Sequence, residues 1–282
     1  MHELTGSRLQ QTQYLQSIFV YTLKSAQIAT ARYVEELLSR PRNADPKRLL
    51  KYGRKVYSQN DEDGILQEIF RRIGTTGRSF VELGVDKGVE CNTAKLLVEG
   101  WRGTWIEGSQ EKTNFIAANF ADFIKEGRLR LVTAMISAEN INDHVSCGPD
   151  PELDLLSIDI DGNDYWVWKA LEAVRPRVVV IEYNAILPPP MSLVVPYDTN
   201  RVWDGSNYYG ASLEALVRLG KDKGYRLVGC CLMGVNAFFV REDLCGDHFF
   251  EPATAEEHFE PARHFHYPGG SHWARPGRYV QV

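Results

Sequence analysis

Two acidic residues at the ends of predicted strands are placed where side chains could bind a nucleoside. Glu82 lies in a buried strand predicted at 79–83, and Glu107 follows a strand predicted at 103–106. An acidic side chain at the end of the second strand of an α/β sheet can accept hydrogen bonds from both hydroxyls of a ribose. The pair therefore predicts a nucleoside site at the carboxyl ends of a parallel sheet.

The glycine spacing after the first strand indicates which nucleoside. Glu82 is followed by Gly84 and Gly88, with Val85 and Asp86 where a dinucleotide fingerprint has glycine and a small residue. The acidic side chains would repel a pyrophosphate, yet they suit hydroxyls and a cationic centre. This favours S-adenosylmethionine over NAD, and we expect both glycines to let the backbone approach that ligand.

A purely structural role is the alternative for the same residues. Gly84 and Gly88 could simply form a tight turn between strand and helix. Glu107 could cap the helix that follows it, although Ser109 is the better candidate for that cap.

A second group of polar residues follows the strands predicted at 154–159 and 177–183. Asp159 and Asp161 share one face of the first strand if the chain stays extended to residue 161, and Glu182 and Asn184 share one face of the second. Oxygen ligands in this number suit Mg²⁺. We predict Asp161, Glu182 and Asn184 as metal ligands, and Asp159 as a further ligand or as the acceptor of the cofactor's amino group.

Candidates for the general base are less specific. Asp164 lies three residues after Asp161, where it could take a proton from a metal-bound hydroxyl, but an N-cap role is the alternative. His264, His266 and His272 lie in an aromatic, glycine-rich tail. This tail could cover the site and bring a histidine base, or it could be a solvated, loosely packed terminus.

A long irregular segment at 186–210 is the predicted substrate loop. It contains Trp203, Tyr208 and Tyr209, whose rings and polar tips suit a sugar. The alternative is that these aromatic residues only cover the sheet edge.

The elements that must position these residues alternate along the chain. Strands are predicted at about 79–83, 103–106, 129–134, 154–159, 177–183, 226–231 and 235–241, with helices between the first six. The last two are joined too closely for a helical crossover, so the seventh must be antiparallel. We predict an α/β fold: a Rossmann-like, seven-stranded, doubly wound sheet with an antiparallel last strand.

An amphipathic helix predicted at about 9–38 precedes this sheet, and Pro41 and Pro46 mark a linker. We predict an N-terminal helical extension and linker at 1–47, a catalytic domain at 48–245 and a C-terminal tail at 246–282. The apolar face of the helix could pack on the catalytic domain or form a homodimer.

Composition restricts the class of partner. The net charge is −5 and the sequence has no long basic block, so nucleic acid is not an expected partner. Five cysteines without Cys-x-x-Cys spacing predict neither a zinc site nor a disulfide framework. With no apparent signal peptide or membrane span, we expect a cytoplasmic protein.

The sequence resembles class I S-adenosylmethionine-dependent methyltransferases over about residues 55–241. The similar stretches are YSQNDEDGILQEIF, FVELGVDKGVECNT, DLLSIDIDGNDYWVW and GVNAFFVR, which look like FkbM-type and, more distantly, metal-dependent sugar O-methyltransferases. The resemblance implies Glu82 and Gly84 beneath the methionine part of the cofactor and Glu107 on its ribose. It also implies residues around 134–136, including Ala134 and Met135, beside the adenine.

The metal-dependent sugar enzymes carry acidic ligands after the fourth and fifth strands, which Asp161 and Glu182 match in position. Their fifth strand ends in adjacent acidic residues, whereas Tyr183 and Asn184 follow Glu182 here. We therefore expect O-methyl transfer from S-adenosylmethionine to a hydroxyl of a sugar, glycan or related natural product, assisted by a divalent metal such as magnesium. Aminopropyl transfer on the same fold and a non-catalytic nucleoside-binding scaffold are the alternatives.

Overall fold

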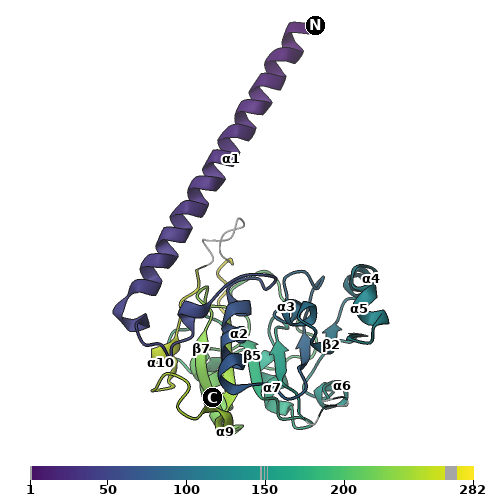
Figure 1. Cartoon of the computed structure of the whole chain (residues 1–282), viewed down its shortest axis with the longest axis vertical. Helices are drawn as coiled ribbons and strands as arrows, with labels where there is room; N and C mark the ends of the chain where they lie inside the picture. Colours follow the sequence, from purple (N-terminus) through teal and green to yellow (C-terminus); the bar gives the residue numbers. More distant parts are fainter. Residues whose placement is uncertain (1, 147, 149, 151, 264–271) are drawn as a thin grey trace. The chain divides into compact units, whose positions relative to one another are not determined.

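The computed structural model describes residues 2–146, 148, 150, 152–263 and 272–282, with side chains from residue 12 onward (Figure 1). The chain divides into two compact units, Met1–Asp45 and Pro46–Val282. The segment 246–282, predicted as a C-terminal tail, falls within the second unit.

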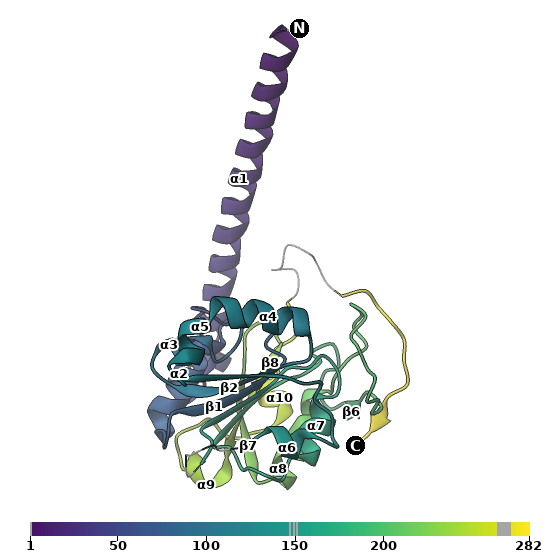
Figure 2. The ribbon, with the colours of Figure 1, turned by 90° about the vertical axis from the view of Figure 1, so that its right-hand side faces the viewer.

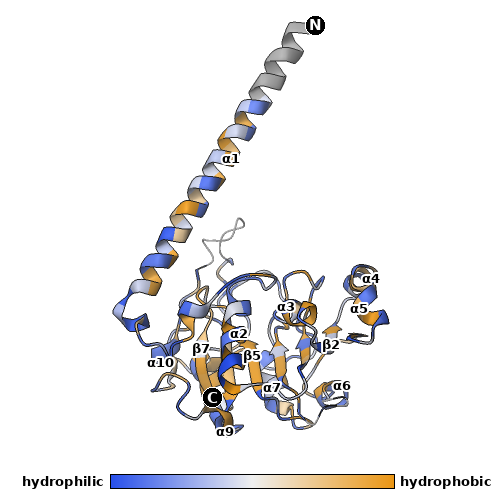
Figure 3. Cartoon of the chain, in the orientation of Figure 1, coloured by the Kyte–Doolittle hydropathy of each residue, from blue (hydrophilic) through white to orange (hydrophobic). Residues whose placement is uncertain are grey.

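The first unit consists of the long helix α1 (His2–Ser39) and a 3-10 turn, η1 (Pro41–Asn43). Polar and apolar residues are interspersed along the coloured part of α1 (Figure 3). The helix runs beyond both ends of the predicted range, and its role in a homodimer stays a prediction. Within the described residues, no helix combines the length and the apolar character needed to cross a membrane.

The second unit is built on a seven-stranded sheet with the order β3-β2-β1-β4-β5-β8-β7. Its strands are β1 (Ser79–Leu83), β2 (Arg102–Glu107), β3 (Leu129–Thr133), β4 (Leu155–Ile158), β5 (Val178–Glu182), β7 (Tyr225–Cys230) and β8 (Asn236–Arg241). Strand β8 is antiparallel to both neighbours, and the pairs among β1 to β5 are parallel. The predicted fold is therefore confirmed.

Helices cover both faces of the sheet. They are η2 (Leu50–Tyr52), α2 (Glu62–Ile73), α3 (Ala94–Val98), α4 (Gln110–Asn119), α5 (Ala121–Lys125), α6 (Ile141–His144), α7 (Asp164–Ala170), α8 (Leu213–Asp222), α9 (Glu242–Cys245) and α10 (Ala255–His258). In Figure 2, α2 to α5 lie on one side of the sheet and α6 to α8 on the other. The strands β1, β4, β5 and β8 are buried along their whole length, as expected for strands with a helix layer on each face.

The two faces carry two separate apolar cores because successive strand residues point to opposite sides. Val180 and Phe238 belong to the core that includes Ile65 of α2, whereas Ile181 and Phe239 belong to the core that includes Trp168 of α7. The odd and even residues of one strand therefore pack in different cores. A shift of the strand by one residue would exchange them, so the register of the strand ends is fixed.

The chain reverses its direction of winding between β3 and β4. Strand β1 pairs with β2 on one side and with β4 on the other, so a crevice opens between β1 and β4 at their carboxyl ends. Ligands of open α/β sheets bind at such a switch point.

A small second sheet ties the C-terminal segment to the predicted substrate loop. Strand β6 (Leu193–Val194) pairs with β9 (Val280–Gln281) in antiparallel register. The sequence analysis did not predict these strands, because two residues are too short a run to show a strand period.

Candidate functional site

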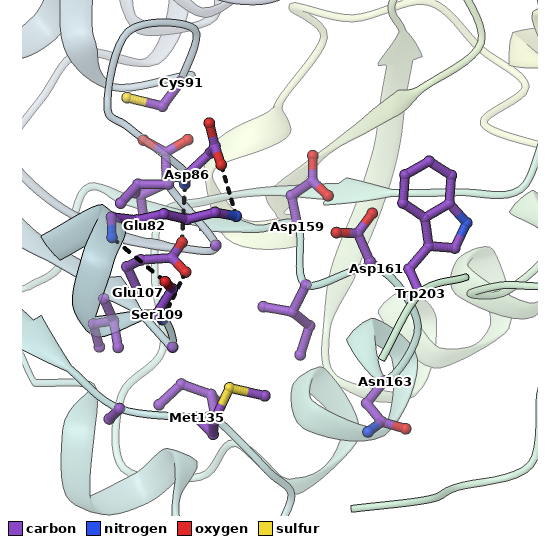
Figure 4. A pocket seen from close by; sticks show the side chains of 18 of the residues that line it. Glu82, Asp86, Cys91, Glu107, Ser109, Met135, Asp159, Asp161, Asn163 and Trp203 are labelled. Carbon is purple, nitrogen blue, oxygen red and sulfur yellow. Dashed lines mark hydrogen bonds and ion pairs between the residues drawn. The ribbon is translucent and has the colours of Figure 1, made fainter. Parts of the chain in front are cut away.

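A cavity of about 720 Å³ lies at the switch point (Figure 4). Its lining comes from the segments that follow β1, β2, β3 and β4, from part of the irregular segment at 199–203, and from Gln59 and Asn236. The volume is in the range of cavities that hold cofactors and other small molecules.

Gly84 is required by the fold at the edge of this cavity. It has φ +75°, and a Cβ atom there would lie 1.7 Å from the carbonyl oxygen of Asp159. The close approach that demands glycine is therefore to the backbone after β4, although Gly84 also lines the cavity.

Gly88 does not line the cavity. A Cβ at Gly88 would lie 2.6 Å from the ring of Trp105, which shows a packing role, and α3 begins only at Ala94. Gly88 therefore contacts the core and not the cavity, contrary to the prediction that it contacts the cofactor. A loop, and not a helix as predicted, follows it.

Glu82 fastens that loop to the sheet. Its carboxylate accepts hydrogen bonds from the backbone N–H of Asn92 (2.7 Å), the backbone N–H of Thr93 (3.0 Å) and the Thr93 hydroxyl (2.5 Å). Burial raises the pKa of Glu82. The side chain also lines the cavity, so one residue both shapes the loop and forms the floor of the site.

Glu107 is oriented by two backbone donors (Figure 4). Its Oε1 accepts from the N–H of Ser109 at 2.9 Å, and its Oε2 accepts from the N–H of Asp86 at 3.0 Å. Each carboxylate oxygen keeps acceptor capacity for a further donor. The helix cap belongs to Ser109, whose hydroxyl accepts from the N–H of Lys112 at 3.4 Å, so Glu107 is free of the capping role.

Lys112 balances charge at the same end of the cavity. Its ammonium lies 2.6 Å from the Asp86 carboxylate, and this hydrogen bond raises the pKa of Lys112. Ala134 and Met135, which follow β3, line the cavity, and their place beside an adenine stays a prediction. Lys112 was missed because a lysine in the first turn of a helix shows no distinctive pattern.

Asp159, Asp161 and Glu182 form an acidic cluster beyond β4 and β5. Each offers a carboxylate oxygen, and these oxygens lie within 4.8 Å of one another. Strand β4 ends at Ile158, and Asp161 has φ +57°, so the prediction that the chain stays extended to residue 161 is wrong. A turn, rather than strand parity, brings Asp161 to the other two.

Holding these carboxylates ionised and close together in a buried site costs free energy unless a positive charge is bound. Burial, followed by repulsion from neighbouring carboxylates, raises the pKa of both Asp159 and Glu182 well above the usual range. Burial also raises the pKa of Asp161, and Lys112 opposes this effect. Like charges held together in a low-dielectric site favour protonation or a bound cation.

Asn184 does not join the acidic cluster, which corrects its prediction as a metal ligand. Its Nδ2 donates to the carbonyl oxygens of Asn207 (3.0 Å) and Tyr209 (2.9 Å), and its Oδ1 accepts from the N–H of Ile186 at 3.2 Å. This fully buried amide holds the irregular segment in place.

Asp164 also has a structural task. Its two oxygens accept from the N–H groups of Ile160 and Gly162, both at 2.8 Å, and its side chain does not line the cavity. Burial raises its pKa to about 6. The structure places Asp164 as a support of the turn that carries Asp161, rather than as a base in contact with a substrate.

Only one of the three predicted substrate residues lines the cavity. Trp203 does so, with its indole N–H donating to the carbonyl oxygen of Ser206 at 2.8 Å. Tyr209 is buried behind it, and Tyr208 packs on Tyr279 with ring centroids 5.1 Å apart. Tyr208 therefore supports the C-terminal segment instead of facing the cavity.

The C-terminal segment brings His272 close to the acidic cluster. The His272 ring lies 4.9 Å from Trp203 and 5.7 Å from Tyr209 between centroids. Partial burial lowers its pKa, and Asp161 opposes this effect. The carbonyl oxygen of Trp273 accepts from the N–H of Asn207 at 3.0 Å, whereas residues 273–278 are exposed, so both interpretations of the tail stay predictions. His264 and His266 lie outside the described residues.

No protein-family profile and no curated protein sequence matches this chain. Among solved structures, the pyocyanin biosynthetic protein PhzM aligns over 62% of this chain and 53% of its own, with 18% identity and a TM-score of 0.38. This chain thus matches about half the length of PhzM. A SAM-dependent methyltransferase from Aquifex aeolicus aligns over 74% of this chain and 97% of its own, with 15% identity and a TM-score of 0.39.

Magnesium protoporphyrin IX methyltransferase from Synechocystis, solved with bound SAM, aligns over 64% of this chain and 77% of its own, with 10% identity and a TM-score of 0.42. At these identities, the order of the strands is the stronger observation. Five parallel strands wound in both directions from β1, with antiparallel β8 between β5 and β7, form the sheet of the class I methyltransferase fold.

Proposed function

We propose that this protein is an S-adenosylmethionine-dependent O-methyltransferase that acts on a hydroxyl of a sugar, glycan or related natural product with the help of a divalent cation. The observation that carries the proposal is one cavity with two different ends. Glu107, preorganised to accept hydroxyls, lines one end, and Asp159 and Asp161 line the other, where Glu182 completes the acidic cluster from outside the lining.

The residues at the first end fit the cofactor. Glu107 would accept the ribose hydroxyls, Ala134 and Met135 would lie beside the adenine, and Glu82 and Gly84 would form the floor under the methionine part. When bound, S-adenosylmethionine supplies a methyl group activated by a sulfonium. Asp159 is positioned to hold the cofactor's amino group or to share in binding the cation.

The residues at the second end fit a divalent cation. Three carboxylates within 4.8 Å supply the oxygen ligands that Mg²⁺ prefers, and their raised pKa values reflect a charge that a cation would neutralise. When bound, such an ion acts as a Lewis acid and a template for a hydroxyl. Asp161 is the exposed member of the cluster, so the acceptor hydroxyl reaches the site on its side.

The acceptor would enter under the irregular segment. Trp203 is 37% exposed and lines the cavity near Arg201 and Thr199. An aromatic ring beside polar groups suits the C–H face and the hydroxyls of a sugar ring.

Aminopropyl transfer is a second candidate, because the same three carboxylates could hold the ammonium group of an amine acceptor. Metal dependence separates the two activities. Chelation should abolish methyl transfer that needs a cation, whereas an amine held directly by carboxylates needs none.

Titration calorimetry of S-adenosylhomocysteine into the purified protein tests the cofactor assignment. Micromolar binding is expected, and no heat at millimolar ligand would overturn it. A panel of sugar and natural-product hydroxyl acceptors, assayed for S-adenosylhomocysteine release with Mg²⁺ and with EDTA, then tests the reaction. Release that is equal under both conditions would remove the cation from the proposal and leave methyl transfer standing.

A further inference from the structure

Two buried oxygen atoms, one in the acidic cluster and one in its neighbour on the next strand, accept no hydrogen bond from any described residue. They are Oδ1 of Asn236 and Oε2 of Glu182, in side chains that belong to residues 2% and 9% exposed. A buried acceptor without a donor costs free energy, so each such atom calls for an explanation such as a bound ion.

The two residues are direct neighbours in the sheet. Glu182 of β5 is opposite Asn236 of antiparallel β8, so their side chains lie on the same face. The pairing of Ile158 with Ile181 brings Asp159 alongside Glu182 at the next step. Asp159, Glu182 and Asn236 therefore form a row across three adjacent strands, with the strands about 4.8 Å apart.

The orientation of the Asn236 amide is determined by its partner. Its Nδ2 donates to Oε1 of Glu62 at 3.0 Å. With its nitrogen bonded to Glu62, the amide places its oxygen elsewhere, where it has no hydrogen-bond donor among the described residues. Glu62 is itself held by the N–H of Asn60 at 2.8 Å, so the arrangement has a fixed support at the start of α2.

We propose that Oδ1 of Asn236 is an additional ligand of the divalent-cation site formed by Asp159, Asp161 and Glu182. This inference rests on the cation of the proposed function and names a residue from a different strand. Asn236 lines the same cavity, and its neutral oxygen adds a ligand without adding negative charge to a crowded cluster. It takes the amide-ligand role that the sequence analysis assigned to Asn184.

Binding of Mn²⁺ to the apo protein, followed by the electron paramagnetic resonance signal of free Mn²⁺, tests the inference. Asn236→Leu keeps the side chain close to its original size and removes the oxygen, so we expect Mn²⁺ affinity to fall about tenfold. Gln59→Leu is the matched control, because Gln59 is an exposed amide that lines the same cavity and is not a member of the row. The control should change Mn²⁺ affinity less than about twofold.

Calorimetry of S-adenosylhomocysteine in metal-free buffer reports whether each variant keeps its folded cavity. Asn236→Ser is the second variant, since a small hydroxyl residue disturbs β8 less than leucine does. If both variants fail to bind S-adenosylhomocysteine, the coupling of ¹³C to Mn²⁺ is measured instead in the wild-type protein labelled at asparagine Cγ. Strong coupling of one ¹³C to bound Mn²⁺ is expected, and its absence overturns the inference.

The outcomes separate the two proposals. Wild-type protein that binds S-adenosylhomocysteine but no Mn²⁺ overturns the cation site and Asn236 with it, and leaves the cofactor assignment standing. Unchanged Mn²⁺ affinity in folded Asn236→Leu overturns only the role of Asn236.

Discussion

The two ends of the cavity differ in whether hydrogen-bond donors occupy their carboxylate oxygens. At the nucleoside end, defined here by Glu107, Asp86 and Lys112, backbone N–H groups and an ammonium occupy the carboxylate oxygens. At the acidic end, defined by Asp159, Asp161, Glu182 and Asn236, two buried oxygens have no donor among the described residues.

The difference shows what each end is prepared to bind. A carboxylate that is already oriented by N–H groups can accept neutral hydroxyls without much reorganisation. A group of buried, unpartnered oxygens instead stores an electrostatic cost that only a cation or protons relieve. Under the proposed function, one cavity would combine a preformed acceptor of hydroxyls with a site that binds positive charge.

The largest expected effect comes from breaking the acidic end. Asp161→Asn should fold normally, because asparagine tolerates the φ of +57° at this position, yet it should lower turnover by about 100-fold through loss of a cation ligand. Release of S-adenosylhomocysteine with the best acceptor measures this. Full activity of the variant in the presence of chelator would show that no metal site operates.

Breaking the nucleoside end should have a smaller effect on binding. We expect Glu107→Ala to weaken S-adenosylhomocysteine binding at least tenfold, or about 1.4 kcal/mol, because the ribose loses its acceptor. Calorimetry measures the affinity, with Glu111→Ala, an exposed acidic residue in the first turn of α4, as the control. Unchanged affinity in Glu107→Ala would remove the ribose assignment.

The free energy of unfolding should depend on pH, because buried carboxyl groups have raised pKa values. Burial raises the pKa of Asp164 to about 6 and that of Asp61 to about 7, so between about pH 4 and 7 the folded state binds more protons than the unfolded chain. The free energy of unfolding therefore increases as the pH falls from 7.5 to 5.5.

In calorimetric melts of metal-free protein, we expect the melting temperature to be about 2–4 °C higher at pH 5.5, the shift that 1 kcal/mol gives in a domain of this size. Adding Mg²⁺ should raise it more at pH 7.5 than at pH 5.5, because protons compete with the cation for Asp159 and Glu182, whose pKa values are also raised by burial. A melting temperature that is lower at pH 5.5 than at pH 7.5 would contradict the prediction that Asp61 and Asp164 bind protons more strongly in the folded state.

The smallest expected effect distinguishes two neighbouring aromatic residues. Trp203→Ala should raise the KM of the acceptor about threefold, since this ring lines the cavity. Tyr208→Ala should leave KM unchanged and lower the melting temperature, because its ring packs on Tyr279. The opposite pattern would place the acceptor under Tyr208.

The fold could be predicted from the sequence, and so could several residues that line the cavity near Glu107, because their signals are local. Continuous apolar runs, short loops and the spacing of Glu82 and Gly84 each lie within a few consecutive residues, and the topology follows from connection lengths. The position of Glu107 could be predicted from the end of one strand alone. The position of the residues after β3 could be predicted from the order of the elements alone.

The acidic end could be predicted only in part. Asp161 and Glu182 were found because they follow strands, but parity could not show that a turn at Asp161 replaces the extended chain. The same reasoning selected Asn184, whose amide nitrogen donates to Asn207 and Tyr209 and whose oxygen accepts from Ile186. Asp164 and Gly88 were assigned to the site for their position alone.

What the sequence determined by itself is therefore the order of elements, the strand ends and the acidic character of the site. What only the tertiary structure decided is which polar atoms remain available there. Asn236 bonds Glu62, a residue 174 positions away along the chain, and that contact turns its oxygen away from Glu62 and leaves it without a partner. Hydrogen-bond satisfaction depends on neighbours brought together by packing, and no local pattern contains it.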